Sequence, residues 1–254
     1  MIKKIIQSAF NILGFRVVRN KPVYPAPVAV PFTMEFQENS MEGGLNRFLK
    51  LGLQVNTIID VGAAEGKWSL LAKPLFSQAN YVLFEPLVER KDQLESLLKE
   101  NSNFHYVPKA AGKEKGSIHF IISPDLDGSG VTYDSDNHNT RSVEVASIQE
   151  ELQQLKLKGP FIIKLDTHGF EVPIIEGCTK LLDQVQLFII ECYGFEIVKD
   201  SLLFWQMCNY MDELGFRVFD IVDIMHRSKD GAFWQCDAFF IRKSHTLFLD
   251  NRYA

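Results

Sequence analysis

Residues 57–66 read Thr57–Ile58–Ile59–Asp60–Val61–Gly62–Ala63–Ala64–Glu65–Gly66. The first half is apolar and rich in β-branched side chains, which is typical of a buried strand, and the small residues after Val61 indicate a tight turn. Apolar residues then recur at helical spacing at Trp68, Leu70, Leu71 and Leu75. The stretch therefore predicts a strand, a turn and a helix of a parallel α/β unit.

Two carboxylates follow neighbouring predicted strands. Asp60 lies near the end of the first strand, and Glu85 comes directly after a second apolar run, Tyr81–Phe84. Because the carboxyl ends of parallel strands meet at one edge of a sheet, we expect both acids at that edge. Open α/β sheets bind ribose-bearing cofactors there.

The turn after the first strand favours one cofactor over another. A dinucleotide site needs a glycine where this chain has Ala64, so that the backbone can approach a pyrophosphate. Glu65 in the same turn would repel a diphosphate, whereas S-adenosylmethionine has no phosphate and carries positive charge. Glu85 is suited to accept hydrogen bonds from the ribose of either cofactor. An ordinary turn without a ligand is the alternative.

The rest of the chain alternates strands and helices up to about residue 243, which predicts an α/β fold with a mainly parallel sheet. We expect seven sheet strands, at 57–62, 80–85, 104–107, 160–166, 187–193, 216–223 and 233–242. The helices between them are expected at 66–76, 87–100, 147–156, 171–183 and 200–214. The last two strands are joined too closely for a crossover and should pair as an antiparallel hairpin.

Two further strand-like runs, 117–122 and 142–147, flank a polar loop at 124–139. Such a loop cannot bury its backbone cheaply, so we expect it at the surface, where it would serve as a lid. Its acids Asp125 and Asp127 are candidates to clamp a substrate or cofactor, and a solvated turn explains them equally well.

Composition excludes some function classes. The chain has 254 residues and a net charge of −5, and it lacks the clustered Lys and Arg that nucleic-acid binding requires. The four cysteines are scattered without metal-ligand spacing, which favours reduced thiols and a cytoplasmic location. No segment reaches the roughly 20 apolar residues of a transmembrane helix.

The N-terminal part divides from the rest. We expect a helix followed by an extended segment in 1–20, a proline-rich linker at 21–31 and a helix at 41–53, which gives an N-terminal segment 1–53 and a main domain 54–254. The first helix is basic and amphipathic. It is expected to pack on its own domain or on a second subunit, as in a homodimer, and peripheral contact with an anionic membrane is left open.

A second set of polar residues follows the fourth predicted sheet strand. Asp166, Thr167 and His168 come directly after the apolar run Phe161–Leu165, and Gly169 permits a tight turn. This tip should lie beside the first strand, at the cofactor edge. An imidazole is well matched to remove a hydroxyl proton, so His168 is the candidate general base and Asp166 its orienting or substrate-holding partner. Alternatively, both residues only shape the turn and cap the next helix.

The fifth strand ends in Glu191 at the same edge. Asp166 and Glu191 together offer the oxygen ligands of a divalent cation, but two carboxylates are a thin basis, and we predict no metal site. Glu191 is instead expected to hydrogen-bond the substrate. Tyr193 and Phe195 are candidates to stack on a sugar or to wall the acceptor pocket, although core packing is the more common role of aromatic residues.

Four blocks of the chain resemble the FkbM-type methyltransferases in their sequence and order. They are 59–69, Phe84–Glu85–Pro86, 163–177 and Ile189–Ile190–Glu191. The resemblance covers roughly residues 55–243. The third block departs from the family pattern because His168 stands where glutamate is common.

This resemblance implies a Rossmann-like class I methyltransferase sheet of seven strands, mostly parallel, with helices on both faces and a C-terminal antiparallel hairpin. It also implies S-adenosylmethionine as methyl donor, with Asp60, Gly62, Ala63, Gly66 and Glu85 around it. Glu65 and Pro86 belong to the same blocks and complete our set of expected cofactor residues.

The expected activity is O-methylation of a hydroxyl on a sugar, a glycan or a related natural product. Two other classes are left open. One is an NAD(P)-dependent oxidoreductase on a similar sheet, and the other is a scaffold that binds the cofactor without turnover, for which the unusual His168 gives room.

Overall fold

The computed structural model describes residues 38–134 and 138–253. These residues belong to one compact unit that spans Phe32–Ala254. The helix and the proline-rich linker that we expect in 1–31 lie outside the described residues. Among those described, no helix combines the length and the apolar character needed to cross a membrane.

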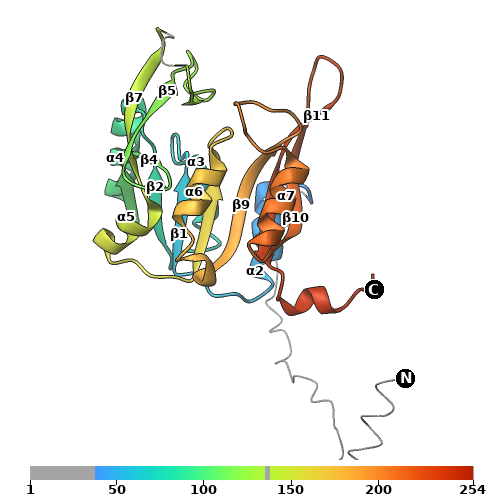
Figure 1. Cartoon of the computed structure of the whole chain (residues 1–254). Coiled ribbons are helices and arrows are strands. Elements are labelled where there is room, and N and C mark those ends of the chain that lie inside the picture. Colours follow the sequence, from blue (N-terminus) through green and yellow to red (C-terminus); the bar gives the residue numbers. More distant parts are fainter. Residues whose placement is uncertain (1–37, 135–137, 254) are drawn as a thin grey trace, which may run out of the picture. The chain divides into compact units, whose positions relative to one another are not determined.

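A seven-stranded sheet forms the centre of this unit (Figure 1). Its strands are β1 (Thr57–Val61), β2 (Asn80–Phe84), β3 (Phe104–Val107), β8 (Phe161–Leu165), β9 (Val185–Tyr193), β10 (Phe216–His226) and β11 (Phe233–Arg242). The spatial order is β10-β11-β9-β8-β1-β2-β3, and only β11 runs antiparallel to its neighbours. The predicted sheet, its seven strands and its C-terminal hairpin are confirmed.

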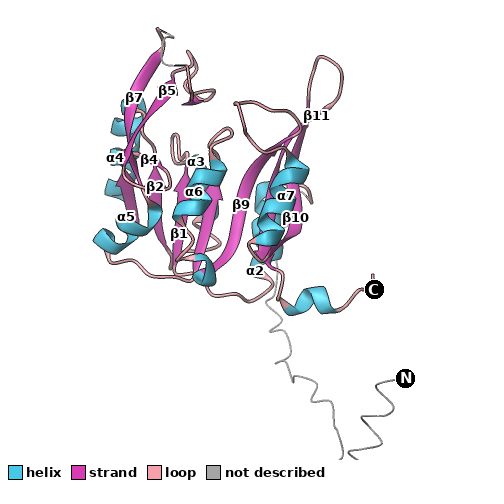
Figure 2. Cartoon of the chain, in the orientation of Figure 1, coloured by secondary structure: helices cyan, strands magenta, loops and turns pink. Residues whose placement is uncertain are grey.

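Helices cover both faces of this sheet (Figure 2). One face packs against α5 (Ile148–Leu155), α6 (Glu171–Gly177) and α7 (Phe204–Glu213). The other packs against α2 (Met41–Leu49), α3 (Lys67–Ala72) and α4 (Lys91–Glu100). The sheet is buried on both sides, which explains why its central strands read as continuous apolar runs.

The alternation of side chains along β1 assigns each residue to a face. Ile59 and Val61 belong to the core under α5, α6 and α7, whereas Ile58 belongs to the core under α2, α3 and α4. Asp60 therefore points to the second face, because successive residues of a strand alternate in direction. The two strand neighbours of β1 are β2 and β8, and all three end at the same edge.

A second sheet, which the sequence patterns did not predict, stands beside the first. It has the order β4-β7-β5-β6 and consists of β4 (Ala110–Ala111), β5 (Gly116–Ile121), β6 (Gly130–Val131) and β7 (Thr140–Ala146). The strands β5 and β7 correspond to the two extra strand-like runs. We expected the intervening loop to lie at the surface. This expectation is wrong for part of the loop, since Gly130 and Val131 are buried and pair with β5.

Several predicted helices end or begin elsewhere. The helix expected at 66–76 ends at Ala72, and the one expected at 171–183 ends at Gly177 and is followed by a 3-10 turn, η2 (Leu182–Gln184). The helix expected at 200–214 begins at Phe204. The helix expected at 87–100 is split into a 3-10 turn, η1 (Val88–Arg90), and α4, and a last 3-10 turn, η3 (Thr246–Leu249), follows β11. The predicted helix at 41–53 ends at Leu49, and this helix, α2, packs on β10.

Candidate active site

A cavity of about 280 Å³ lies at the carboxyl edge of the central strands. It opens between the ends of β1, β2, β8 and β9 and the loop that carries β6. Its lining includes the strand-end residues Gly62, Glu85, Pro86, Asp166, His168 and Glu191, and from the loop Asp127, Ser129 and Gly130. The sequence therefore predicted the location of the cavity, at the edge where parallel strands end.

Gly62 allows the turn after β1 to pass close to β8. Its φ is +76°, a left-handed conformation that favours glycine. A Cβ at this position would lie 2.0 Å from the backbone oxygen of Asp166. The close approach of the two strand ends places the Asp166 side chain beside the turn at residues 62–66. We call this turn, where the sequence predicts the cofactor, the cofactor turn.

Glu85 is held rigidly at the end of β2. Its carboxylate accepts hydrogen bonds from the backbone N–H of Ala64 and of Leu87, each at 2.9 Å. Burial raises the pKa of this carboxyl above its ordinary value, against the effect of these backbone donors. The carboxylate links the cofactor turn to the β2 end and still has acceptor positions toward the cavity.

Asp60 does not line the cavity. It is fully buried on the other face of the sheet, and its Oδ2 accepts a hydrogen bond of 2.7 Å from Ser69 of α3. Its Oδ1 has no hydrogen-bond partner among the described residues. Burial raises the pKa of this carboxyl. Asp60 therefore ties β1 to α3 from beneath, and Ala63 and Gly66 likewise lie outside the cavity lining.

An arginine that the sequence analysis did not single out connects the cofactor turn to the lid loop. Arg90 is buried, and its guanidinium donates to Glu65 and to Asp127, both at 2.5 Å. Glu65 is outside the cavity lining, whereas Arg90 and Asp127 line it. The Nη1 atom contacts Glu65 and the Nη2 atom contacts Asp127, so one guanidinium ties the loop to the turn after β1.

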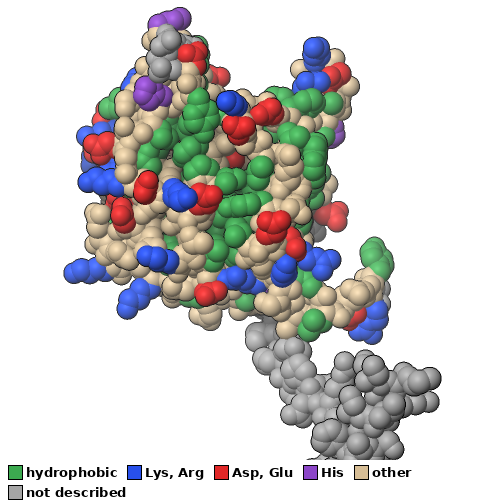
Figure 3. All heavy atoms as spheres, in the orientation of Figure 1, with side chains coloured by type: hydrophobic (Ala, Val, Ile, Leu, Met, Phe, Trp, Pro, Cys, Tyr) green, Lys and Arg blue, Asp and Glu red, His purple; other side chains and the backbone are tan. Residues whose placement is uncertain are grey.

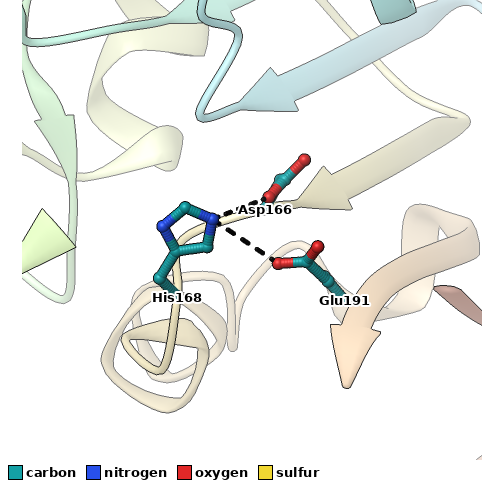
Figure 4. A group of neighbouring side chains, drawn as sticks. All are labelled: Asp166, His168 and Glu191. Carbon is teal, nitrogen blue, oxygen red and sulfur yellow. Dashed lines mark ion pairs between the residues drawn. The ribbon is translucent and has the colours of Figure 1, made fainter. Parts of the chain in front are cut away.

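Three side chains of the cavity lining converge (Figure 4). The Nε2 atom of His168 lies 3.6 Å from Oδ1 of Asp166 and 3.7 Å from Oε2 of Glu191. The Nδ1 atom lies 3.2 Å from the carbonyl oxygen of Ser129. Because a carbonyl oxygen can only accept, Nδ1 carries a proton, and Nε2 is left as the ring nitrogen that can accept one from a ligand.

Lys164 controls the charge of this group. It is buried in β8, and its Nζ lies 2.7 Å from Oδ2 of Asp166. Although burial acts in the opposite direction, this ammonium lowers the pKa of Asp166. Burial and the neighbouring Asp166 carboxylate raise the pKa of Glu191, which also accepts hydrogen bonds from Tyr193 and Gln235. Glu191 is therefore the neutral member and Asp166 the ionised one.

A second cavity, of about 340 Å³, adjoins the first. It shares Asp127, Gly130, Val131 and His168 with the first cavity and is otherwise lined by Ile121, Gly128, Tyr193, Ile197, Val198 and Trp234. His168 thus stands in the wall between the two cavities. A group bound in either cavity can reach its imidazole.

The structure brings together Gly62, Glu85, Pro86 and the group of Asp166, His168 and Glu191, but it leaves Asp60, Ala63, Glu65 and Gly66 behind the cavity wall. Sequence reasoning missed four residues that shape the site, which are Arg90, Ser129, Lys164 and Trp234. Of these, Lys164 had a usable signal, because a lysine in an otherwise apolar strand must have buried partners.

The donor set of the first cavity fits S-adenosylmethionine better than a dinucleotide. Four acidic side chains line it, against one arginine that is already paired with two carboxylates. Its apolar wall includes Phe84, Leu87 and Ile174. Because the one arginine is paired, the described lining offers no free cation to a pyrophosphate, and its carboxyl groups suit hydroxyl and ammonium donors better.

Asp166, His168 and Glu191 are also arranged as a group that a metal ion would accept, with one ligand atom from each within 4.8 Å of the others. Lys164 already supplies a positive charge to Asp166, and the raised pKa of Glu191 keeps its proton. The group is thus close to charge balance without an ion.

Comparison with known proteins agrees with this geometry. The model of the methyltransferase FkbM domain matches residues 60–218. Among curated proteins, none matches the sequence with statistical significance.

Several solved structures share the overall fold at low identity. Methyltransferase FkbM from Methylobacillus flagellatus KT is 16% identical with a TM-score of 0.46, and the alignment covers 74% of this chain and 45% of that one. Precorrin-6y C5,15-methyltransferase from Geobacter metallireducens GS-15 is 13% identical with a TM-score of 0.45, covering 80% and 88%. TrmK of M. capricolum, solved with S-adenosyl-homocysteine, is 7% identical with a TM-score of 0.44, covering 79% and 68%.

The chain spans less than half of the length of the Methylobacillus protein. The family match covers more than half of this chain and includes the cofactor turn, the β2 tip and the Asp166–His168–Glu191 group. The chain belongs to the methyltransferase FkbM domain family.

Proposed function

We propose that the protein transfers the methyl group of S-adenosylmethionine to a hydroxyl oxygen of a sugar or glycan precursor. The observation that carries this proposal is the position of His168, which lines both cavities and whose Nε2 is the ring nitrogen not held by the Ser129 carbonyl. One cavity suits the cofactor, and the other suits an acceptor that presents its hydroxyl to the imidazole.

In this proposal the first cavity holds the cofactor. Gly62 and Pro86 give it backbone surface, and Glu85 accepts hydrogen bonds from the ribose hydroxyls. Asp60, Ala63, Glu65 and Gly66 act from behind the wall. They hold the turn through the Ser69 contact of Asp60, the Arg90 contact of Glu65 and the backbone bond from Gly66 to Ala63.

The reaction is a displacement in which His168 prepares the nucleophile. The bound cofactor supplies an electrophilic methyl group on its sulfonium. Nε2 of His168 accepts the hydroxyl proton as the oxygen–carbon bond forms, and the Ser129 carbonyl holds the ring by its Nδ1–H. The Asp166 carboxylate, 3.6 Å away, stabilises the resulting imidazolium, and Glu191 is placed to hydrogen-bond the acceptor.

We propose that no metal takes part. A cation on Nε2 of His168 would occupy the lone pair that the mechanism needs, and Lys164 already neutralises Asp166. Two other functions fit less well. A nicotinamide-dependent oxidoreductase would need to place a pyrophosphate among four acidic side chains. A scaffold without turnover would leave the position of His168, in the lining of both cavities, without a function.

A sugar acceptor is supported by the aromatic rings of Tyr193 and Trp234 in the second cavity, since such rings stack on sugar faces. A cytoplasmic location is proposed from the four free cysteines, of which Cys178, Cys192 and Cys236 are buried.

A labelled-methyl transfer assay tests the proposal. The full chain is incubated with methyl-labelled S-adenosylmethionine and a panel of nucleotide sugars, free glycans and lipid-linked glycans, with and without magnesium. We expect label on an acceptor hydroxyl, with equal rates in both conditions. Label on carbon or nitrogen, or a thermal shift with NAD or NADP but none with S-adenosylhomocysteine, would contradict it.

A further inference from the structure

The second cavity carries information about the acceptor itself. We propose that it is a subsite that selects a neutral ring with an apolar face, such as a 6-deoxy sugar, over a fully hydroxylated or phosphate-bearing sugar. This inference rests on the proposed function and narrows its substrate class.

Most of the side chains that line the cavity cannot hydrogen-bond a ligand. Ile121 comes from β5, and Ile197 and Val198 come from the loop after β9. Trp234 of β11 adds a large ring with a single N–H donor. Figure 3 shows this side of the molecule hollowed between the β5–β7 and β10–β11 hairpins, with hydrophobic side chains along both flanks. A ligand in this cavity therefore loses water from a large part of its surface without gaining polar partners.

Tyr193 offers its ring but not its hydroxyl. Its O–H donates to Glu191, so the phenol is already satisfied. The ring packs edge to face with Trp234, at 5.9 Å between centroids and 86° between planes. The polar end of the tyrosine thus serves the catalytic group, and its apolar body serves the second cavity.

Trp234 is fixed from behind. Its ring lies 5.7 Å from that of Phe195 at 31°, and the Arg227 guanidinium covers Phe195 at 4.0 Å. Arg227 is itself paired with Asp230 in the hairpin turn. A ring that is held in one orientation is ready to stack on a ligand, because little side-chain freedom is lost on binding.

The charges of the cavity exclude a phosphate-bearing acceptor. Among the residues that the structure describes, its lining includes Asp127 and His168 but no Lys or Arg. A nucleotide sugar would bring two negative charges beside the Asp127 carboxylate, without a cation in the lining to balance them. The acceptor ring is consequently neutral where it enters this cavity.

Hydrogen-bond capacity gives the preference for a deoxy ring. The polar groups near the base are sufficient to orient the reacting hydroxyl, whereas a hydroxyl placed against Ile121, Ile197 or Val198 would lie against side chains that offer it no partner. Such a group costs enough free energy to weaken binding by about tenfold.

Calorimetry on the full chain saturated with S-adenosylhomocysteine tests this subsite. The probes are two matched pairs, methyl α-L-rhamnopyranoside with methyl α-L-mannopyranoside and methyl α-L-fucopyranoside with methyl α-L-galactopyranoside, and each pair differs only in the 6-hydroxyl. At least one deoxy glycoside is expected to bind about tenfold more tightly than its partner. Equal binding within both pairs, tighter binding of a hydroxylated partner, tighter binding of UDP-glucose, or no binding at all would overturn the inference.

Variants locate the preference. Trp234→Ala should abolish the difference within the pair, and Trp234→Phe should keep most of it, because an aromatic face remains. The matched control is Trp205→Ala, since Trp205 is an exposed tryptophan of α7 outside the lining of both cavities. An unchanged preference in Trp234→Ala would overturn the inference. S-adenosylhomocysteine binding in every variant reports folding, and its absence in the wild type would instead remove the proposed function.

Discussion

At the scale of single residues, the imidazole of His168 has one nitrogen for positioning and one for chemistry. Nδ1 is bound to the Ser129 carbonyl, and Nε2 faces Asp166 and Glu191. A His168→Gln variant should bind S-adenosylhomocysteine as the wild type does, while kcat falls by about 10² to 10⁴ because no proton acceptor remains. Calorimetry and the labelled-methyl assay measure the two effects. The control is His119→Gln on the exposed side of β5, and a rate that is unchanged in His168→Gln would contradict the role of the base.

Asp237 on β11 gives a prediction for stability against pH. Burial raises the pKa of its carboxyl from 3.8 to about 7, against the attraction of Lys164. Between these values the folded state holds a proton that the unfolded state has released, so stability falls as pH rises from about 4 to about 7 and stays low above that. The contribution is on the order of 2 kcal/mol, with allowance for its partial exposure.

In Asp237→Asn this contribution is absent. The variant should therefore lose less stability than the wild type between pH 5 and pH 8, as measured by thermal unfolding followed by circular dichroism. Parallel curves for the two proteins would show that Asp237 does not titrate in this window. Asn is close in size to Asp, which makes the comparison one of charge.

The residues of the site were predictable to different degrees. Asp166, His168 and Glu191 could be found from the sequence because each follows a buried apolar run, and strand ends of a parallel sheet share one edge. The orientation of Asp60 follows from the alternation along β1, which the sequence analysis did not apply. Arg90 and Ser129 could not be found, because their partners lie 25 or more positions away in the chain.

At the scale of elements, the contact between the β1 turn and the end of β8 sets the site. Gly62→Ala should destabilise the protein by roughly 3 kcal/mol or more, since its Cβ would meet the Asp166 backbone oxygen. Gly52→Ala is the matched control, because Gly52 has a similar φ of +70° and nothing within 4 Å, and it should cost only about 1 kcal/mol. Urea unfolding compares the two, and equal losses would mean that strain alone, without the strand contact, explains Gly62.

The lid loop gives a second prediction for an element. Arg90→Ala removes the contacts that join Glu65 and Asp127 through one buried guanidinium, so stability should fall and S-adenosylhomocysteine should bind more weakly. Arg141→Ala is the control, since it breaks an exposed pair with Glu89 that is worth less than about 1 kcal/mol. If calorimetry shows that Arg90→Ala and Arg141→Ala weaken cofactor binding equally, the Arg90 contacts do not hold the loop for cofactor binding.

The elements themselves were easier to predict than their ends. A long buried strand such as β9 leaves a continuous apolar run in the sequence, and this run predicts a strand more readily than a helix or a loop. The second sheet escaped prediction because β4 and β6 have only two residues each and owe their pairing to β7 and β5. The helix α6 ends at Gly177, whose Cβ would meet the Gly112 backbone oxygen at 2.6 Å, and this long-range contact has no local signal.

At the scale of the whole molecule, the sheet brings four acidic side chains to one cavity at its carboxyl edge and leaves the only arginine of the described lining fully paired. The neighbouring cavity is apolar, and His168 joins the two. The lack of an unpaired cation in the described lining, and not any one motif, explains why a methyl donor without phosphate fits better than a dinucleotide.

Titration of the full chain with S-adenosylmethionine and, separately, with NADP by isothermal calorimetry tests this account most directly. The account predicts saturable binding of S-adenosylmethionine. It predicts no heat of binding with NADP, because the described lining holds no unpaired cation for its phosphates. Saturable binding of NADP together with no binding of S-adenosylmethionine by the folded protein would contradict it.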